Sequence, residues 1–339
     1  MRAVSWGGML AGLVIGLATG WSAATASDFE NAFPEPWPSS QEPLLALPSP
    51  EDALPLGFTP PRTSWSEDPT PLIPPLRDDL RCDRCEAWTW KVLPDGLLYR
   101  SYAAGVKEPR FSSVYLYDAQ RGWSWDNALG GRVGVVRHGT PGSVNAAGWQ
   151  LDMEGAVFAR LTPEEKDDLD ASDYRFGVPF TWSDGQNAAK FGYYHISSHL
   201  GDEFLLKNPD YPRNNYVRDG LLWGLSREMT PETRIYGEAG WAFSTDGGAK
   251  PWEFHFGSEY ARRSVDERKA APFAAIHANL REEFNYDGNL NVLAGWQWLG
   301  RESGRAFRVA LQYFRGKSSQ YSFYDQRDRM VGGGLWFEY

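Results

Sequence analysis

The chain has 339 residues, a net charge of −10 and an unusually high aromatic content of 16 Trp, 16 Tyr and 18 Phe. The acidic balance argues against nucleic acid as a partner, because a phosphate-binding surface needs a basic face. The mean hydropathy of −0.49, with no run of about 20 apolar residues after the N-terminus, excludes a bundle of transmembrane helices. A membrane β-barrel fits these values, because its wall alternates lipid-facing and lumen-facing residues.

The first 26 residues resemble an export signal. Arg2 supplies the positive start, and an apolar segment follows from Met9 to Ala18. Ala24-Thr25-Ala26 then offers the small-x-small pattern of a cleavage site. The apolar segment is too short to span a membrane as an anchor. We therefore predict a signal peptide over residues 1–26 and export from the cytoplasm.

The next segment, residues 27–80, has the composition of a linker. Thirteen of the 23 prolines lie between residues 34 and 75, among Ser, Glu and Asp. Such a composition cannot bury a core and favours extended conformations. Residues 81–110 form a lead-in segment on the periplasmic side. It holds the only two cysteines, Cys82 and Cys85, for which we expect a local disulfide in an exported protein, with other roles left open.

From residue 111 onward, apolar and polar residues alternate with a period of two, which is typical of strands with one face in an apolar environment. Several segments approach the nine to eleven residues that a tilted bilayer crossing needs. The pattern predicts twelve strands, near residues 111–118, 123–136, 148–161, 173–183, 188–199, 214–227, 233–244, 251–262, 272–283, 289–299, 305–316 and 329–339.

The predicted fold is all-β: an antiparallel transmembrane barrel of about twelve strands over residues 111–339. A soluble sandwich also alternates, but an even strand count with both termini on one side closes naturally as a barrel. Aromatic residues recur near the strand ends, as they do at membrane interfaces. We expect a bacterial outer-membrane location, both termini in the periplasm, and the loops near residues 200–213 and 317–328 outside the cell. The last strand ends at Tyr339, and we expect the outer-membrane assembly machinery to recognise it.

The candidate catalytic residues lie on the strands near 188–199 and 214–227. Alternation places His195 and Ser197 on the lipid-facing side, where polar groups are costly. A hairpin centred near residue 207 sets His195 opposite Asp219. A shifted register would bring Asn215 there instead. Either partner could orient an imidazole that accepts the proton of the Ser197 hydroxyl, as a serine acyl hydrolase requires.

The loop after His195 and Ser197 also offers oxygen atoms to a cation. Asp202, Glu203 and Asp210 are the candidate ligands, with Ca²⁺ as the possible ion. Their spacing does not match an EF-hand loop, and a solvated acidic loop is the alternative interpretation.

The His195-x-Ser197 pair on an outward-facing strand, followed across a loop by an Asn or acidic residue, resembles outer-membrane phospholipase A and, more loosely, the lipid A deacylase barrels. The resemblance implies a His–Ser catalytic pair that faces outer-leaflet lipid. Over most of residues 80–339, and most clearly from Tyr194 to Glu203 and from Asn215 to Asp219, the chain also resembles a family of bacterial barrels known only as a domain of unknown function.

The sequence leaves two classes of function open. As an enzyme, the protein would hydrolyse ester bonds of outer-membrane lipids through Ser197, His195 and either Asp219 or Asn215. As a non-enzymatic barrel, it would be a structural or small-solute transport protein, with its polar residues at the rim simply approaching headgroups and water. Charged lumenal residues such as Glu154, Arg160, Glu253 and Arg308 could close a barrel of this size.

Overall fold

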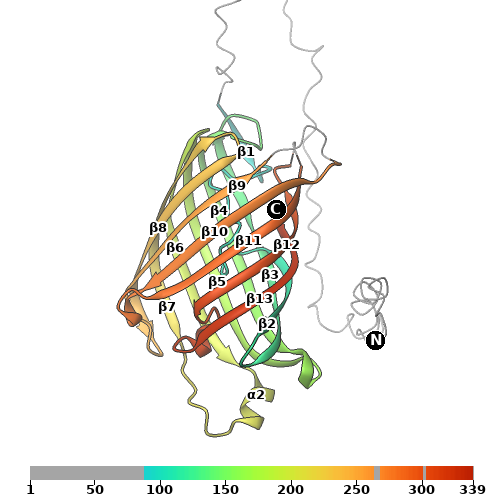
Figure 1. Ribbon diagram of the computed structural model, residues 1–339. Coiled ribbons are helices and arrows are strands. Elements are labelled where there is room, and N and C mark those ends of the chain that lie inside the picture. Colours follow the sequence, from blue (N-terminus) through green and yellow to red (C-terminus); the bar gives the residue numbers. More distant parts are fainter. Residues whose placement is uncertain (1–87, 263–267, 301–302, 339) are drawn as a thin grey trace, which may run out of the picture. The chain divides into compact units, whose positions relative to one another are not determined.

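The computed structural model describes residues 88–262, 268–300 and 303–338 (Figure 1). Within these residues, thirteen strands form one antiparallel sheet, and twelve of them, β2 to β13, close on themselves as a barrel. The predicted all-β, twelve-stranded fold is confirmed. The predicted signal peptide, linker, Cys82, Cys85 and Tyr339 lie outside the described residues. No helix in the described part of the chain is long and apolar enough to cross a membrane.

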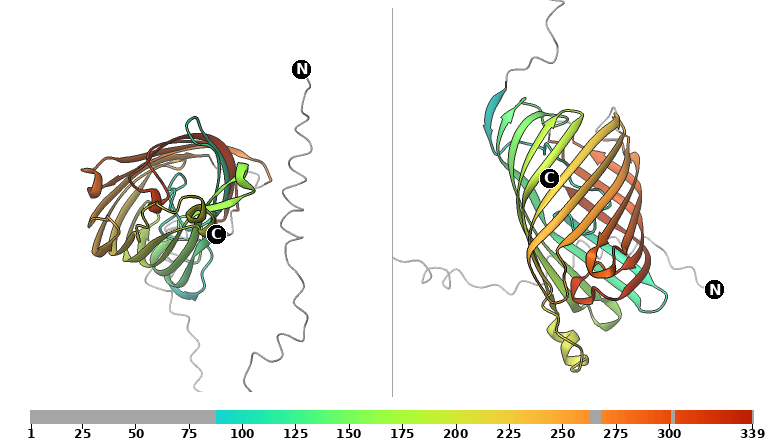
Figure 2. Two further views of the ribbon diagram at one scale, coloured as in Figure 1. Left: turned by 90° about the horizontal axis from the view of Figure 1, so that it is seen from below. Right: turned by 90° about the vertical axis from the view of Figure 1, so that its left-hand side faces the viewer.

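The barrel strands follow one another around the wall in sequence order, each tilted against the barrel axis (Figures 1 and 2). They are β2 (Phe111–Asp118), β3 (Gly122–Gly139), β4 (Ala147–Thr162), β5 (Asp168–Asp184), β6 (Asn187–Leu200), β7 (Val217–Thr230), β8 (Thr233–Asp246), β9 (Trp252–Ala261), β10 (Ala271–Arg281), β11 (Gly288–Leu299), β12 (Ala306–Lys317) and β13 (Arg327–Glu338). A short additional strand, β1 (Thr89–Val92), pairs with the end of β3.

The barrel closes where β13 pairs with β2, and glycines make this contact possible. Gly332 lies opposite Leu116, and Gly334 lies opposite Val114. A Cβ atom at Gly332 would lie 1.8 Å from the carbonyl oxygen of Tyr115. The two backbones therefore approach too closely for a side chain at this position.

The two faces of the wall differ in the way that the alternation predicts. Large apolar side chains are exposed on the outer surface, among them Leu129, Trp149, Phe180, Trp223, Trp296 and Leu311. Charged side chains are buried on the inner surface and pair there; Arg132 bonds to Asp152 (2.6 Å) and Arg175 to Glu154 (2.9 Å). An apolar exterior around a polar interior is the arrangement of a barrel that crosses a membrane.

Residues 93–110 run into the lumen after β1, and we call them the plug. Tyr102 donates a hydrogen bond to Glu238 of β8 (2.9 Å), and the backbone N–H of Ala103 donates to Glu259 of β9 (2.8 Å). Lys107 forms an ion pair with Asp173 of β5. The sequence analysis assigned only a lead-in role to this segment, and its place inside the barrel is a new finding.

At the opposite end, a second segment folds inward. The 3₁₀ turn η5 (Tyr321–Phe323), between β12 and β13, is fully buried. The hydroxyl of Ser322 lies 2.7 Å from that of Ser198 on the inner face of β6, and the backbone N–H of Tyr321 donates to Asp173 (3.1 Å). The plug and η5 thus meet around the same buried carboxylate, and together they fill much of the lumen.

The longest described loop, between β6 and β7, carries the short helix α2 (Asp202–Lys207), which projects from the end of the barrel that is remote from the C-terminus (Figure 1). Lys207 bonds to Asp168 (2.6 Å) and to Glu165 at the base of the neighbouring loop. These two hydrogen bonds raise the pKa of the Lys207 ammonium group. The loop is therefore attached to the barrel rim at this point.

Candidate active site

The strand pair β6–β7 adopts the register that the sequence predicted. His195 lies opposite Asp219, and Ser197 lies opposite Val217. The shifted register is not formed; Asn215 precedes β7 in the loop and is exposed. Lumen-facing neighbours such as Tyr194 are buried, whereas the side chains of His195 and Asp219 are 34% and 25% exposed. His195, Ser197 and Asp219 thus share the outer face, close to the end that carries α2.

His195 and Asp219 are joined by a hydrogen bond of 2.9 Å between the ring Nδ1 and the carboxylate Oδ1. Because Nδ1 is engaged by the carboxylate, the other ring nitrogen, Nε2, is the one that remains to exchange a proton with a substrate or a hydroxyl group. A His oriented by a carboxylate through one nitrogen is the base–orienter half of a catalytic triad.

Ser197 lies two residues beyond His195 on the same face, a spacing of about 7 Å along a strand. No hydrogen bond joins its hydroxyl to His195 in the described part of the chain. Catalytic hydrogen bonds are often long before a substrate is bound and tighten in the complex. The structure therefore brings His195 and Asp219 together, and it places Ser197 on the same face, two residues along the strand, without a formed contact.

Tyr193 is a member of this site that the sequence analysis did not single out. Its hydroxyl donates to the same oxygen of Asp219 that contacts His195, at 2.6 Å. Its ring stacks beside Phe243 of β8, with centroids 6.4 Å apart. Tyr193 is diagonal to Asp219 across the strand pair, which is a distance that long aromatic side chains can bridge. That diagonal is the only signal in the sequence that could have identified it.

The predicted calcium ligands are separate from this site. Asp202 and Glu203 lie in the first turn of α2, Asp210 follows in the loop, and all three are exposed. Among the described residues, no group of three or more His, Cys, Asp or Glu side chains is arranged to hold a metal ion. The calcium site stays a prediction without structural support.

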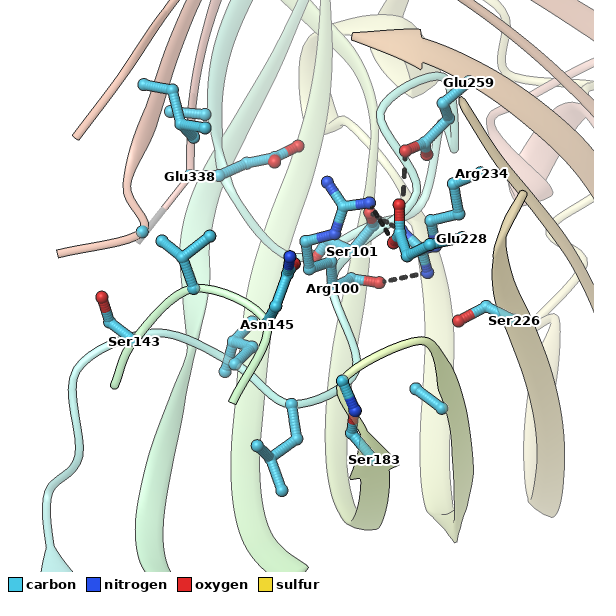
Figure 3. A pocket seen from close by; sticks show the side chains of 18 of the residues that line it. Arg100, Ser101, Ser143, Asn145, Ser183, Ser226, Glu228, Arg234, Glu259 and Glu338 are labelled. Carbon is cyan, nitrogen blue, oxygen red and sulfur yellow. Dashed lines mark hydrogen bonds and ion pairs between the residues drawn. The ribbon is translucent and has the colours of Figure 1, made fainter. Parts of the chain in front are cut away.

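A pocket lies at the opposite end of the barrel, around the plug (Figure 3). Arg100 of the plug bonds to Glu228 at 2.5 Å, and Arg234 donates to the carbonyl oxygen of Arg100 at 2.8 Å. The cavity measures about 70 Å³, whereas pockets for organic ligands usually measure about 300–1,000 Å³. We place the candidate site on the outer face of β6 and β7 because the hydrogen bond between His195 and Asp219 lies there.

No match was found among curated proteins. The chain is similar, at low identity, to several solved structures, including the following three. Outer membrane phospholipase A from Escherichia coli is 9% identical with a TM-score of 0.45, covering 72% of this chain and 96% of that one. The calcium-bound phospholipase dimer from Salmonella typhi is 11% identical with a TM-score of 0.45, covering 71% and 95%. The KdgM porin is 10% identical with a TM-score of 0.38, covering 66% and 98%.

These neighbours include a phospholipase and a porin, and likeness at this level does not choose between such activities. The family comparison covers more of the chain. Residues 80–339 match the family model described as "Protein of unknown function (DUF1207)". This range contains the whole barrel and the plug. The chain belongs to the DUF1207 family of proteins of unknown function.

Proposed function

We propose that the protein is an outer-membrane barrel that hydrolyses ester bonds of membrane lipids at its outer face. The observation that carries this proposal is the 2.9 Å hydrogen bond between His195 Nδ1 and Asp219. It lies on a surface surrounded by exposed aromatic and aliphatic side chains, where an unpaired ionisable group is costly. A polar cluster on such a surface needs a role that offsets its cost to stability. Chemistry on lipid is the role that the geometry of the cluster fits.

The reaction would proceed by acyl transfer. The Oγ atom of Ser197 attacks the ester carbonyl carbon while Nε2 of His195 accepts the hydroxyl proton. The bond between the carbonyl carbon and the alcohol oxygen then breaks, and His195 returns the proton to the departing alcohol. Water attacks the acyl-serine by the same route and releases the fatty acid. Asp219 stabilises the imidazolium that forms in both steps.

The alternative function, passage of a small solute through the lumen, is less well supported by the interior of the barrel. The plug fills one end, and η5 is buried at the other. Lumenal charges are engaged with each other, as in the ion pair between Lys190 and Glu238 (2.5 Å). A solute could pass only if these contacts separated. A barrel without catalysis or transport remains the outcome that the experiment below must exclude.

The test is lipid hydrolysis by the purified full-length protein in detergent. Release of fatty acid from phospholipid and from lipopolysaccharide is followed with and without Ca²⁺, since the calcium prediction involving Asp202, Glu203 and Asp210 bears on the cofactor. Ser197→Ala and His195→Ala should each reduce turnover by a factor of about 10³ or more. Asp219→Ala should reduce it less, because it acts through His195.

Two neighbouring residues provide matched controls. His199 lies on the same outer face, and its ring lies beside that of Tyr174, with centroids 5.7 Å apart. Ser198 follows Ser197 but faces the lumen, where it bonds to Asp173. His199→Ala and Ser198→Ala should retain hydrolysis in whatever fraction remains folded. No release from either lipid by the wild type, or full activity of Ser197→Ala, would show that the site is not a hydrolase.

A further inference from the structure

Four cationic side chains gather on the outer face of β12 and β13, at the end that carries α2. Arg315 lies directly opposite Arg329, and one step nearer the loop Lys317 lies opposite Arg327. Arg315, Arg327 and Arg329 are exposed, and Lys317 is half-buried. Like charges placed directly opposite each other across a strand pair are destabilising. Two such pairs in succession therefore need negatively charged or hydrogen-bonding partners that offset the repulsion.

The row nearer the loop finds partners within the protein. Arg327 forms an ion pair with Asp287, and Lys317 donates to the carbonyl oxygen of Asp325 at 2.7 Å. The other row does not. Neither the Arg315 nor the Arg329 side chain has a hydrogen-bond or ion-pair partner among the described residues. Two guanidinium groups thus face outward, side by side, without a counter-charge from the part of the chain that the structure describes.

The aromatic residues of the adjacent strands indicate the depth of this pair in a membrane. Tyr117 of β2 and Trp123 of β3 have ring centroids 5.2 Å apart, and their side chains are 42% and 46% exposed. Tyr117 lies opposite Val331, which is the next outward-facing residue after Arg329 in the chain. Exposed Tyr and Trp rings settle at the membrane interface. Arg315 and Arg329 lie one step beyond that level, where lipid phosphates are found.

We propose that Arg315 and Arg329, supported by Lys317 and Arg327, bind the phosphate groups of a bisphosphorylated glycolipid of the lipid A class. The planar guanidinium fork matches phosphate oxygens in a bidentate manner. The positive charge of the four cations, reduced by the one carboxylate that pairs with them, Asp287, is larger than the single negative charge of a glycerophospholipid phosphodiester. They match two phosphate monoesters, each of which carries about −1.5 to −2 charges. The proposal rests on the outer-membrane location and is independent of catalysis.

The test is native mass spectrometry of the full-length barrel in detergent, titrated with bisphosphorylated lipid A. Ser197→Ala serves as the background, so that hydrolysis cannot consume the lipid. The parent protein, with both arginines in place, should retain the lipid. The double variant Arg315→Ala and Arg329→Ala should bind it at least tenfold more weakly. Arg315→Lys with Arg329→Lys should fall between the two, because charge is kept and the fork is lost. Without lipid, the double alanine variant should unfold no more readily than its parent.

The control is a pair of cationic residues at the other end of the barrel, Lys91 and Arg262, which pair with Asp95 (3.6 Å) and Glu232 (3.9 Å). Lys91→Ala with Arg262→Ala should bind lipid A as the parent does. Phosphate-free lipid A, phosphatidylglycerol and inorganic phosphate should each bind at least tenfold more weakly. Equal binding of any of these three probes, or unchanged binding by the double arginine variant, would overturn the proposal even if the hydrolase is active.

Discussion

The two faces of strands β6 and β7 carry similar residue types in different settings. On the inner face, Lys190 bonds to Glu238 at 2.5 Å and its ammonium lies 4.9 Å from the centre of the Tyr99 ring. Gly224, opposite Lys190, leaves the room that this side chain and Tyr99 occupy, since a Cβ there would lie 2.8 Å from both. On the outer face, His195 and Asp219 are partly exposed and share one hydrogen bond.

The difference separates a structural role from the chemical role that we propose. An inner charge is desolvated, so it must be matched by partners or it destabilises the fold. An outer polar group that keeps an unused nitrogen or hydroxyl stays available to a ligand. The inner network therefore holds the barrel and its plug together, whereas the outer cluster, under the function that we propose, would react without being needed for folding. Substitutions in the inner network should therefore lower stability. Substitutions in the outer cluster should lower activity and leave stability unchanged.

The largest expected effect is at the inner charge pairs. Asp152 of β4 is fully buried and accepts two hydrogen bonds from Arg132 of β3, at 2.6 and 3.1 Å. Asp152→Ala removes both of these hydrogen bonds from the buried guanidinium and leaves it only the longer contact with Glu154 (3.9 Å), a loss that costs about 3 kcal/mol. Urea unfolding of the barrel in lipid vesicles, followed by tryptophan fluorescence, should show this loss. Asp325→Ala, at an exposed loop carboxylate, should unfold as the wild type does; equal effects would contradict the assigned role of the lumen.

An intermediate effect is expected at the plug. The Tyr102 hydroxyl donates to Glu238 and lies 2.7 Å from the Tyr99 hydroxyl, and its ring stacks on Tyr236 with centroids 3.9 Å apart. Tyr102→Phe keeps the stacking but leaves buried polar groups without a partner, at a cost of about 1–3 kcal/mol. Amide hydrogen exchange over residues 93–110 should accelerate in this variant. Unchanged exchange there would show that the hydroxyl does not hold the plug.

The regular part of the barrel could be predicted because a period of two reports directly which residues face an apolar environment. The opposition of His195 and Asp219 followed from the same reasoning, once the centre of the hairpin was placed. The plug could not be predicted in this way. Residues 93–110 have no regular period, and their burial depends on side chains from strands more than 60 residues away, such as Asp173 and Glu238.

Local irregularities limited the prediction of the site as well. The ladder between β7 and β8 shifts between Asp219 and Gly220, and such a bulge re-aims the side chains around it. Alternation alone does not indicate it. The hydroxyl of Tyr193 reaches Asp219 across the diagonal, a contact that depends on side-chain rotamers rather than on sequence spacing. The opposition of Arg315 and Arg329 depends on the register between β12 and β13, which the structure provides.

The smallest expected effect on stability is at the candidate active site, and its sign is informative. His195 and Asp219 face the apolar exterior, where ionisable groups are unfavourable. Replacing both by leucine removes the two ionisable partners together. Only the Tyr193 hydroxyl, on a partly exposed side chain, loses its acceptor, so the free energy of unfolding in lipid vesicles should stay unchanged or rise. Hydrolysis should be lost in the same protein. Sites that are kept for chemistry are often a stability cost to the fold, because function selects groups that packing does not favour. If the double leucine variant instead loses stability as Asp152→Ala does, the pair belongs with the structural charges of the lumen, and the contrast between the two faces fails at its most important point.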